Sequence, residues 1–380
     1  MRVVFDARHL QTVSRTRGIG RYSRNLLEAF VRRAPDDIAW TLLTLRNFPA
    51  ADRSPLPVHA TRATYRLRRP ELSMLMLDPL LLPFELAGQG DLYHSVQLGL
   101  PAVGRGPVVL TLHDLAPLHW PSHYLRLPYA RAGHAWQYAL AKRADAIIAV
   151  SEATKVDVVA RLGVPPERVH VIPEAVDQGF RPPSRDAGAQ VARDRFGVRG
   201  RYVLYVGQFD PRKNMDGLFR AFARAAEREP ELRLVIVGTL GKLAPLMRDA
   251  LARSRVDPAR VVMTGGVDDA TLAALYAGAE ALLHAAWLEG FGLTPLESLA
   301  AGTPVVGYRA GAVAEVVGDA GLLVDDRDPD ALGEALVTLL SSSALQADLR
   351  SRAKPRAARF SWDRAADDTL AVYRSLYHLP

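Results

Sequence analysis

The segment from Glu289 to Glu297 has the residue types of a site that binds a phosphate group. It reads Glu-Gly-Phe-Gly-Leu-Thr-Pro-Leu-Glu and lies between an apolar run ending near His284 and a helical pattern. Gly290 and Gly292 allow the backbone to approach a ligand closely. A helix that begins just after them offers free N–H groups and the positive end of its dipole. Glu289 has no evident structural role in this glycine-flanked loop, so we predict that it is functional.

Thr294 and Glu297 allow two interpretations. Thr294 is a favourable N-cap and Pro295 suits the first helical position. The spacing Thr294-x-x-Glu297 is also that of a capping box, in which Glu297 satisfies the N-cap amide. A ligand-binding role for Glu297 is equally consistent with these residues.

A second candidate segment, 207–214, reads Gly-Gln-Phe-Asp-Pro-Arg-Lys-Asn and also lies between a strand pattern and a helical pattern. Arg212 and Lys213 would stand at the same sheet edge as Glu289, where a cation can neutralise a leaving diphosphate. Only five of the 48 Lys and Arg residues are Lys, so a lysine at this position hints at a need for a compact ammonium. The alternative interpretation is a solvent-exposed basic turn.

The N-terminal half offers weaker signals. The run Gly18-Ile-Gly-Arg-Tyr22 precedes a helical pattern, but it lacks the third glycine of a dinucleotide fingerprint and follows Asp6 by about eleven residues. A dehydrogenase is therefore disfavoured. His113 ends an apolar strand pattern, where it could contact a sugar hydroxyl or be structural. Asp326-Arg-Asp328 precedes Pro329, and we interpret it as a helix-capping loop rather than a metal site.

The elements that must position these residues are short apolar runs that alternate with helical patterns along the whole chain. This alternation predicts βαβ units with parallel sheets. The expected strands are 2–6, 39–45, 91–95, 108–113, 146–150, 202–206, 232–237, 261–263, 281–284, 304–306 and 321–324. We therefore predict an α/β protein of two doubly wound, Rossmann-like domains, with the ligand site at the carboxyl ends of the strands, in a cleft between the domains.

The domain boundaries follow from composition. The stretch 173–200 carries Pro173, Pro182 and Pro183 with little strand pattern, which is typical of a linker. We predict an N-terminal domain over 1–175, a linker over 176–200, a C-terminal domain over 201–358 and a C-terminal helical segment over 359–380.

Composition excludes several classes of function. A length of 380 residues suggests two domains, and 49% hydrophobic with 23% charged residues is typical of a folded globular protein. The absence of cysteine excludes disulfides, thiolate nucleophiles and Cys-ligated metals. The net charge of +7 comes from mostly scattered basic residues without interleaved aromatics, so we expect no nucleic-acid partner. The opening residues resemble a strand rather than a signal segment, and we expect a cytoplasmic protein.

One segment could bring the protein to a membrane. A basic cluster precedes the apolar stretch Leu72–Phe84, and such a pair can dock on an anionic bilayer. The cluster consists of Arg62, Arg66, Arg68 and Arg69. The alternative is a core helix behind a solvated loop, which is equally compatible with the interruptions at Asp78, Pro79 and Pro83.

Together these motifs resemble glycosyltransferase family 4. The Glu289 to Glu297 pattern is similar to the family's E-x7-E motif, and further matches cover nearly the whole chain. They are Asp6-Ala-Arg8, Gly18-Ile-Gly-Arg-Tyr22, Leu112-His-Asp-Leu115, Val150-Ser-Glu152, Val171-Ile-Pro173, Pro211-Arg-Lys-Asn214, Gly265-Gly-Val267, Ala301-Gly-Thr-Pro304 and Phe360-Ser-Trp362. The resemblance implies a GT-B fold, no metal or other cofactor, and transfer of a sugar from a nucleotide donor with retention of configuration.

The resemblance also implies roles for single residues. Lys213, helped by Arg212, would face the donor diphosphate, and Glu297 would bind the ribose hydroxyls. Glu289 would hold the donor sugar, and His113 would lie near the reacting sugar. The implied catalytic set is His113, Lys213, Arg212 and Glu289; the implied donor-binding set is Gly18, Gly20, Arg21, Gln208, Val267, Gly290, Phe291, Gly292, Leu293, Thr294 and Glu297.

Three positions depart from the family pattern. Gln208 stands where many members have Arg, so diphosphate binding would depend on Arg212 and Lys213. Glu174-Ala175 replaces the usual Asn-Gly near the hinge. Trp287 replaces the usual residue three positions before Gly290, which could alter the donor-sugar pocket.

The resemblance favours a hexosyltransferase that uses GDP-mannose in polysaccharide or glycolipid assembly, with a glycan or lipid-linked acceptor. A UDP-glucose or other hexose transferase is one alternative, and a catalytically inactive nucleotide-sugar-binding protein is another. No Ser or Cys nucleophile with a paired base is evident. Transfer would then depend on positioning and electrostatics, with the leaving phosphate as acceptor of the proton.

Overall fold

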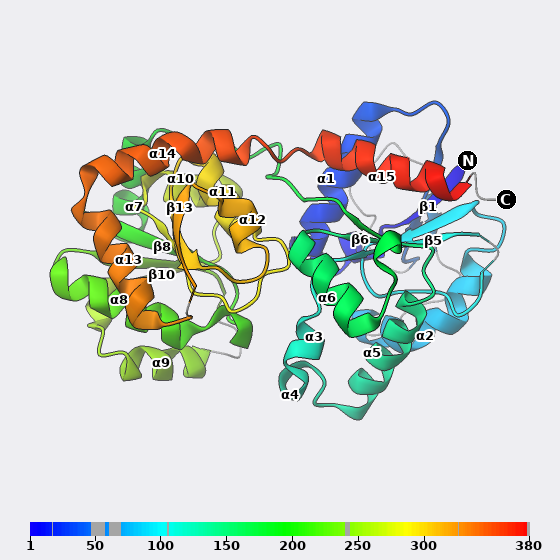
Figure 1. Ribbon diagram of the computed structural model, residues 1–380, viewed down its shortest axis with the longest axis horizontal. Helices are drawn as coiled ribbons and strands as arrows, with labels where there is room; N and C mark the ends of the chain where they lie inside the picture. The colour runs from blue at the N-terminus through cyan, green and yellow to red at the C-terminus, as the bar shows by residue number, and fades with distance from the viewer. Residues whose placement is uncertain are drawn as a thin grey trace. The chain divides into compact units, whose positions relative to one another are not determined.

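The computed structural model describes residues 1–16, 18–46, 58–60, 70–104, 106–239, 244–325 and 327–377. The chain forms two compact units, each built around its own sheet (Figure 1). Unit 1 contains residues 1–174 and 361–380, and unit 2 contains residues 175–360.

Unit 1 has a seven-stranded parallel sheet in the order β3-β2-β1-β4-β5-β6-β7. Its strands are β1 (Arg2–Asp6), β2 (Ala39–Thr44), β3 (Val58–Ala60), β4 (Leu92–Ser95), β5 (Val108–Leu112), β6 (Ala146–Ala149) and β7 (Val169–Val171). Its helices are α1 (Gly18–Arg33), α2 (Pro70–Glu85), α3 (Ala116–His119), α4 (Pro121–Tyr124), α5 (Pro128–Ala141), α6 (Glu152–Leu162) and α15 (Trp362–Tyr377). Strands β3 and β7, at the two edges of the sheet, are additional to the predicted ones.

Unit 2 has a six-stranded parallel sheet in the order β10-β9-β8-β11-β12-β13. Its strands are β8 (Tyr202–Val206), β9 (Arg233–Val237), β10 (Val261–Gly265), β11 (Leu282–His284), β12 (Val305–Tyr308) and β13 (Gly321–Val324). Its helices are α7 (Arg185–Phe196), α8 (Met215–Arg228), α9 (Ala244–Arg253), α10 (Asp269–Gly278), α11 (Leu293–Ala300), α12 (Val313–Val317), α13 (Pro329–Ser341) and α14 (Ser343–Ala357).

The inner strands are buried on both faces, because helices cover both sides of each parallel sheet. Every residue of β6, Ala-Ile-Ile-Ala, is buried, as is every residue of β11 and β12. This confirms the predicted fold class of two doubly wound α/β domains.

Side chains cap the starts of two helices, α6 and α13. The Ser151 hydroxyl accepts a hydrogen bond from the Thr154 N–H and caps α6. Asp328 caps α13, with Pro329 at the first turn. This agrees with the interpretation of Asp326-Arg-Asp328 as a capping loop, although Asp326 itself lies outside the described residues.

The stretch 176–200, for which the sequence predicts a linker, contains a helix that belongs to unit 2. Ser184 caps α7, and Gly197 ends it in the left-handed conformation with φ of 68°. Gly188 lets α7 lie directly against α10, since a Cβ at this position would come within 2.4 Å of the Ala274 carbonyl oxygen. The prolines before Ser184 therefore mark the start of a helix rather than a flexible connection.

The C-terminal helix α15 belongs to unit 1 and packs along α1. Its buried face includes Trp362 and Tyr373, and the Trp362 ring lies edge-on to Tyr22 of α1 at 5.6 Å between ring centroids. At the solvent side, Arg32 forms an ion pair of 2.8 Å with Asp363. Residues after 360 thus complete the core of the N-terminal unit.

Helix α2 combines a buried face with exposed apolar side chains. Met74 and Leu82 are buried, and Gly133 of α5 lies close enough to α2 that a Cβ there would be 3.2 Å from Leu75. On the solvent side, Leu77, Leu80 and Phe84 are 43%, 55% and 71% exposed. Helix α2 therefore packs against the core on one face and exposes apolar side chains on the other. The four arginines that precede it lie outside the described residues.

No helix in the described part of the chain has both the length and the apolar character needed to cross a bilayer.

Candidate active site

The strand order of unit 2 reverses between its neighbours β8 and β11, and this switch point is where open α/β sheets bind ligands. The loop after β8 carries Gln208, Arg212 and Lys213, and the loop after β11 carries Glu289. The topology therefore brings the two segments singled out from the sequence to the same place.

The Arg212–Lys213 turn is held at both ends by side-chain caps. Asp210 Oδ1 accepts a hydrogen bond of 3.2 Å from the Arg212 N–H. Asn214, in the left-handed region at φ of 52°, accepts one of 3.1 Å from the Gly217 N–H and so caps α8. Two cationic side chains are thereby fixed at a rigid turn.

Glu289 is the shared partner of these cations. Lys213 Nζ donates to Glu289 Oε1, and Arg212 Nη1 donates to Oε2 at 3.2 Å. The backbone holds the two loops together as well, because the Trp287 N–H donates to the Arg212 carbonyl at 2.7 Å. The Gln208 side chain, by contrast, is exposed.

His284 also faces Glu289, which the sequence did not suggest. Its Nε2 lies 3.3 Å from Glu289 Oε1, and its side chain is only 2% exposed. The only sequence signal was an imidazole at the end of an otherwise apolar strand. His284 is buried and polar and lies at the carboxyl end of a strand beside the switch point, so it is a candidate functional residue.

The cations determine the charge of Glu289. Burial by itself would raise its pKa, but the charge of Lys213, followed by contributions from His284 and Arg212, holds that pKa well below its usual range. Glu289 is therefore ionised, and two cations face one carboxylate. Arg212 Nε also lies 3.6 Å from Asp210 Oδ1, so two cations and two carboxylates meet at this turn. Both cations are of the kind that binds an anionic ligand such as a diphosphate.

Of the two interpretations of Thr294 and Glu297, the capping box is wrong. Helix α11 begins at Leu293, its N-cap is Gly292 at φ of 103°, and no side chain caps it. Thr294 thus lies inside the first turn, because the glycine in the left-handed region starts the helix earlier. Glu297 is 4% exposed, and its Oε2 accepts a hydrogen bond of 2.9 Å from the Tyr276 hydroxyl.

The other predicted donor-binding residues lie in different settings. The Phe291 ring is buried and packs edge-on against Phe360 at 5.6 Å between ring centroids, so its side chain belongs to the core. The 289–292 loop is fixed from behind, where Ala312 N–H donates to the Glu289 carbonyl at 3.1 Å. Val267 is half-buried after β10, at the same carboxyl edge as β8 but two strands away.

In unit 1, Gly18, Gly20 and Arg21 of the implied donor-binding set form the first turn of α1. Gly20 is buried with no room for a side chain: a Cβ would be 2.3 Å from the Ser14 carbonyl oxygen. His113 directly follows β5 and is 18% exposed. Gly18, Gly20, Arg21 and His113 belong to unit 1, whereas Lys213 and Glu289 belong to unit 2.

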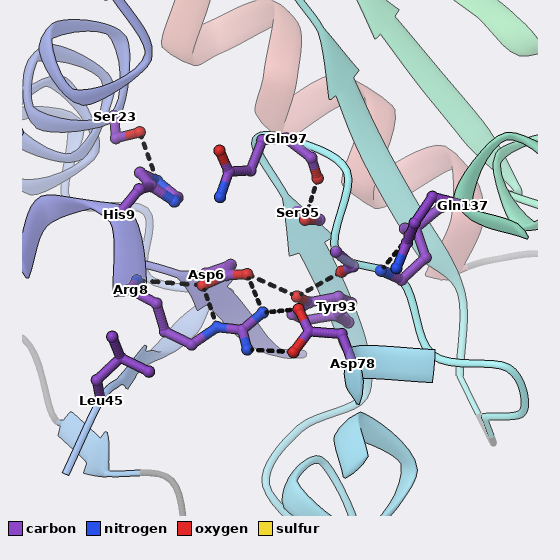
Figure 2. Close-up of polar contacts among 12 residues, drawn as sticks. Asp6, Arg8, His9, Ser23, Leu45, Asp78, Tyr93, Ser95, Gln97 and Gln137 are labelled. Carbon is purple, nitrogen blue, oxygen red and sulfur yellow. Dashed lines mark hydrogen bonds and ion pairs between the residues drawn. The ribbon is translucent and has the colours of Figure 1, made fainter. Parts of the chain in front are cut away.

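The switch point of unit 1, between β1 and β4, holds a buried charged network (Figure 2). Arg8 is fully buried; its guanidinium lies 2.7 Å from Asp6 Oδ2 and 2.8 Å from Asp78 Oδ2. The Tyr93 hydroxyl donates to Asp6 Oδ2 at 2.9 Å. The sequence could not reveal this pairing, because Asp78 is 70 positions away from Arg8, in the mostly apolar helix α2.

Metal ligation finds no support in the described segments, where no group of three or more His, Asp or Glu side chains could hold an ion.

Two family models cover most of the chain. The model of "Glycosyl transferases group 1" matches residues 190–356, and the model of "Glycosyltransferase Family 4" matches residues 16–180. The boundary between the two matches falls close to the boundary between units 2 and 1.

Several curated proteins are similar over much of their length. A D-inositol 3-phosphate glycosyltransferase of Salinispora arenicola is 33% identical over 76% of this chain and 69% of its own. An MMP alpha-(1->4)-mannosyltransferase of Mycolicibacterium hassiacum is 32% identical over 75% of this chain and 71% of its own. An O-antigen chain mannosyltransferase B of Escherichia coli is 28% identical over 75% and 74%.

Solved structures share the fold. Sucrose-phosphate synthase of Thermosynechococcus elongatus superposes with a TM-score of 0.79 at 22% identity, covering 99% of both chains. Anabaena HepE in complex with UDP-glucose gives a TM-score of 0.73 at 19% identity, covering 99% of this chain and 100% of that one.

Proposed function

The chain belongs to the group 1 glycosyl transferases, with a family 4 domain in its N-terminal half and a GT-B fold. From this we propose that it transfers a hexose from a nucleotide-sugar donor to a glycan or lipid-linked acceptor. GDP-mannose is the favoured donor. One observation carries the proposal: Arg212 and Lys213 converge on the buried Glu289 at the switch point of unit 2.

In this proposal the donor diphosphate displaces Glu289 from the two cations. Lys213 and Arg212 then stabilise the charge that develops on the leaving diphosphate, which is where preorganised charge lowers a barrier most. Glu289, released from the cations, becomes available to the hydroxyls of the donor sugar. Glu297, in the middle of α11, would bind the ribose.

We propose transfer with retention and without a metal ion. The positive charge of an oxocarbenium-like state at the sugar would be balanced by the departing phosphate, which takes the bonding electron pair and lies on the same face, and that phosphate would accept the acceptor's proton. The positive charges at the carboxyl edge of unit 2 would fill the role that a divalent cation has in other transferases.

The names of the relatives support the choice of donor. Two similar proteins are named mannosyltransferases, which supports GDP-mannose, whereas the structure of HepE holds UDP-glucose. UDP-glucose or another hexose donor is therefore the alternative. The Lys213–Glu289 pair favours an active enzyme over an inactive nucleotide-sugar-binding protein.

A thermal-shift comparison of GDP, UDP and ADP in the presence of EDTA tests the donor and the independence from metal together. At about 100 times its dissociation constant, the right nucleotide should raise the melting midpoint by on the order of 5 °C. We expect GDP to give the largest shift, undiminished by EDTA. A larger shift with UDP would favour the glucose alternative, and a shift that needs added Mg²⁺ or Mn²⁺ would contradict the metal-free mechanism.

We further propose that α2 docks on an anionic bilayer. Leu77, Leu80 and Phe84 follow one another at helical spacing and are exposed, so they can insert between lipid headgroups. The basic cluster that precedes α2 in sequence would add about 1 kcal/mol per arginine near the surface. This would bring unit 1 to a lipid-linked acceptor.

Liposome flotation tests this docking. Wild type should bind phosphatidylglycerol vesicles at low salt and bind weakly at high salt. Replacing Leu77, Leu80 and Phe84 by Ser should weaken binding by roughly 100-fold, because each side chain loses part of its transfer free energy. Val156→Ser on α6, where Val156 is 65% exposed, is the matched control and should bind like wild type. Equal binding of the triple variant would show that α2 does not contact lipid.

A further inference from the structure

His113 is held from several elements of unit 1. Its Nδ1 lies 3.0 Å from Glu174 Oε1, and its Nε2 lies 3.2 Å from the carbonyl oxygen of Val96, which follows β4. The ring of Tyr22 from α1 packs edge-on at 4.8 Å between ring centroids. Thr154 of α6 donates its hydroxyl to the His113 carbonyl at 3.3 Å. The imidazole therefore has one orientation.

Both ring nitrogens of His113 face oxygen atoms. The Val96 carbonyl can only accept, so Nε2 must carry a proton to form this contact. The contact between Nδ1 and Glu174 Oε1 then needs a second proton. With this proton on Nδ1, the contact is a charge-assisted hydrogen bond between an imidazolium and a carboxylate. The heavy-atom geometry at both ring nitrogens fits an imidazolium paired with a carboxylate.

The surroundings of Glu174 favour the same arrangement. Its side chain is 4% exposed, and no described residue donates a hydrogen bond to its buried Oε2. An ionised carboxylate with one oxygen unsatisfied is costly to bury without a cation beside it. His113 is the only charged partner that the ion-pair contacts among the described residues give Glu174.

The nearby titratable groups do not replace His113 as that cation. Burial lowers the pKa of His9 to about 4 and that of His94 to about 3, so both are neutral near pH 7. Burial raises the pKa of Tyr22, and its hydroxyl lies beside Thr111 at 3.2 Å. Asp114 next to His113 accepts a hydrogen bond from the Ala116 N–H at 2.9 Å instead.

We propose that Glu174 is a positioning residue that keeps His113 as a doubly protonated imidazolium, so that His113 serves as a fixed positive charge and not as a base. This inference rests on the proposed function. It adds a role for Glu174, which stands where the family usually has the Asn of its Asn-Gly pair. Glu174 is the last residue of unit 1 before the chain enters unit 2. In this proposal, the carboxylate at position 174 replaces the family's usual Asn because it is needed to pair with the charged His113.

The consequence is a division of roles in the transfer. A base is excluded at His113, because both ring nitrogens already carry protons, so the acceptor's proton must go to another group such as the leaving phosphate. The imidazolium, whose ring is partly exposed, stabilises negative charge on a ligand at the carboxyl edge of the unit 1 sheet.

Magnetic resonance of isotope-labelled histidine, with His113 assigned from the spectrum of His113→Gln, tests the proposal. At neutral pH, wild type should show protons on both ring nitrogens of His113. Glu174→Gln keeps the size and one acceptor oxygen but removes the charge, so one ring nitrogen should lose its proton. Glu174→Asp keeps the charge and should restore part of the doubly protonated population.

Glu85→Gln is the matched control, since Glu85 is also a buried carboxylate beside a histidine, with Oε2 3.7 Å from His59 Nε2. It should leave His113 unchanged. Turnover in Glu174→Gln should be roughly 10-fold lower at neutral pH and should decline at a lower pH than in wild type.

A deprotonated ring nitrogen on His113 of wild type, or an unchanged His113 in Glu174→Gln, would overturn the proposal. The magnetic-resonance readout needs no substrate. A wild-type protein without transferase activity but with doubly protonated His113 would therefore contradict the proposed function and still support the Glu174–His113 pair.

Discussion

Lys213→Ala should lower turnover by roughly 30- to 1000-fold, which corresponds to about 2–4 kcal/mol in the barrier. The side chain of Lys213 is 11% exposed and its ammonium is paired with Glu289, so a ligand phosphate meets it in a largely desolvated position where charge acts strongly. Removal of the charge leaves Arg212 as the cation in direct contact with Glu289 on this turn. Turnover is measured as release of nucleoside diphosphate at saturating donor.

The fold should survive this substitution, because the turn is fixed by Asp210 and Asn214 rather than by the lysine. Lys354→Ala is the matched control: Lys354 belongs to the same unit but is exposed on α14. Turnover of Lys213→Ala at the wild-type rate would show that the 211–213 turn is only a solvated basic loop.

Arg8→Met should destabilise unit 1 by about 3–5 kcal/mol, the cost of leaving buried charges without a partner. Arg8, Asp6 and Asp78 are all fully buried (Figure 2). Burial tends to raise the pKa of Asp6, but Arg8 keeps that pKa below its usual value. Without Arg8 the carboxylates would bind protons in the folded state above their unfolded pKa. The loss of stability should therefore be smaller at low pH and grow as pH rises.

Denaturant unfolding at several pH values measures this loss. Arg32→Met removes an exposed ion pair with Asp363 and should cost no more than about 1 kcal/mol. The triple change Asp6→Asn, Arg8→Met, Asp78→Asn should recover much of the lost stability, because it removes the unpaired charges. A cost below about 1 kcal/mol for Arg8→Met, or one independent of pH, would mean that the aspartates do not need Arg8 to remain ionised.

The fold class could be predicted from the sequence because parallel strands buried on both faces are continuous apolar runs. Edge strands β3 and β7 could not, since each has three residues and lacks such a run. The helix α7 was missed because prolines that precede an N-cap resemble a linker. For these three elements the local sequence fits a loop as well as a strand or helix, and packing against the rest of the unit determines the structure.

The candidate site was predictable to a similar extent. Lys213 and Glu289 each follow a strand, and parallel topology brings strand ends to one edge, so their convergence could be anticipated. The starting residue of α11 could not, because the left-handed conformation of Gly292 overrode the favourable cap at Thr294. The contacts of Glu174 with His113 and of Asp78 with Arg8 join residues 61 and 70 positions apart, which no local pattern encodes.

The central claim is that the chain moves a hexose from a nucleotide sugar. Its most direct test is incubation of the wild-type protein with GDP-mannose or UDP-glucose and a panel of glycan, inositol phosphate and lipid-linked acceptors, with nucleoside diphosphate release and labelled product followed together. We expect acceptor-dependent release from GDP-mannose that is lost in Lys213→Ala. Absence of product from every donor and acceptor, with no melting shift from GDP or UDP, would contradict the account.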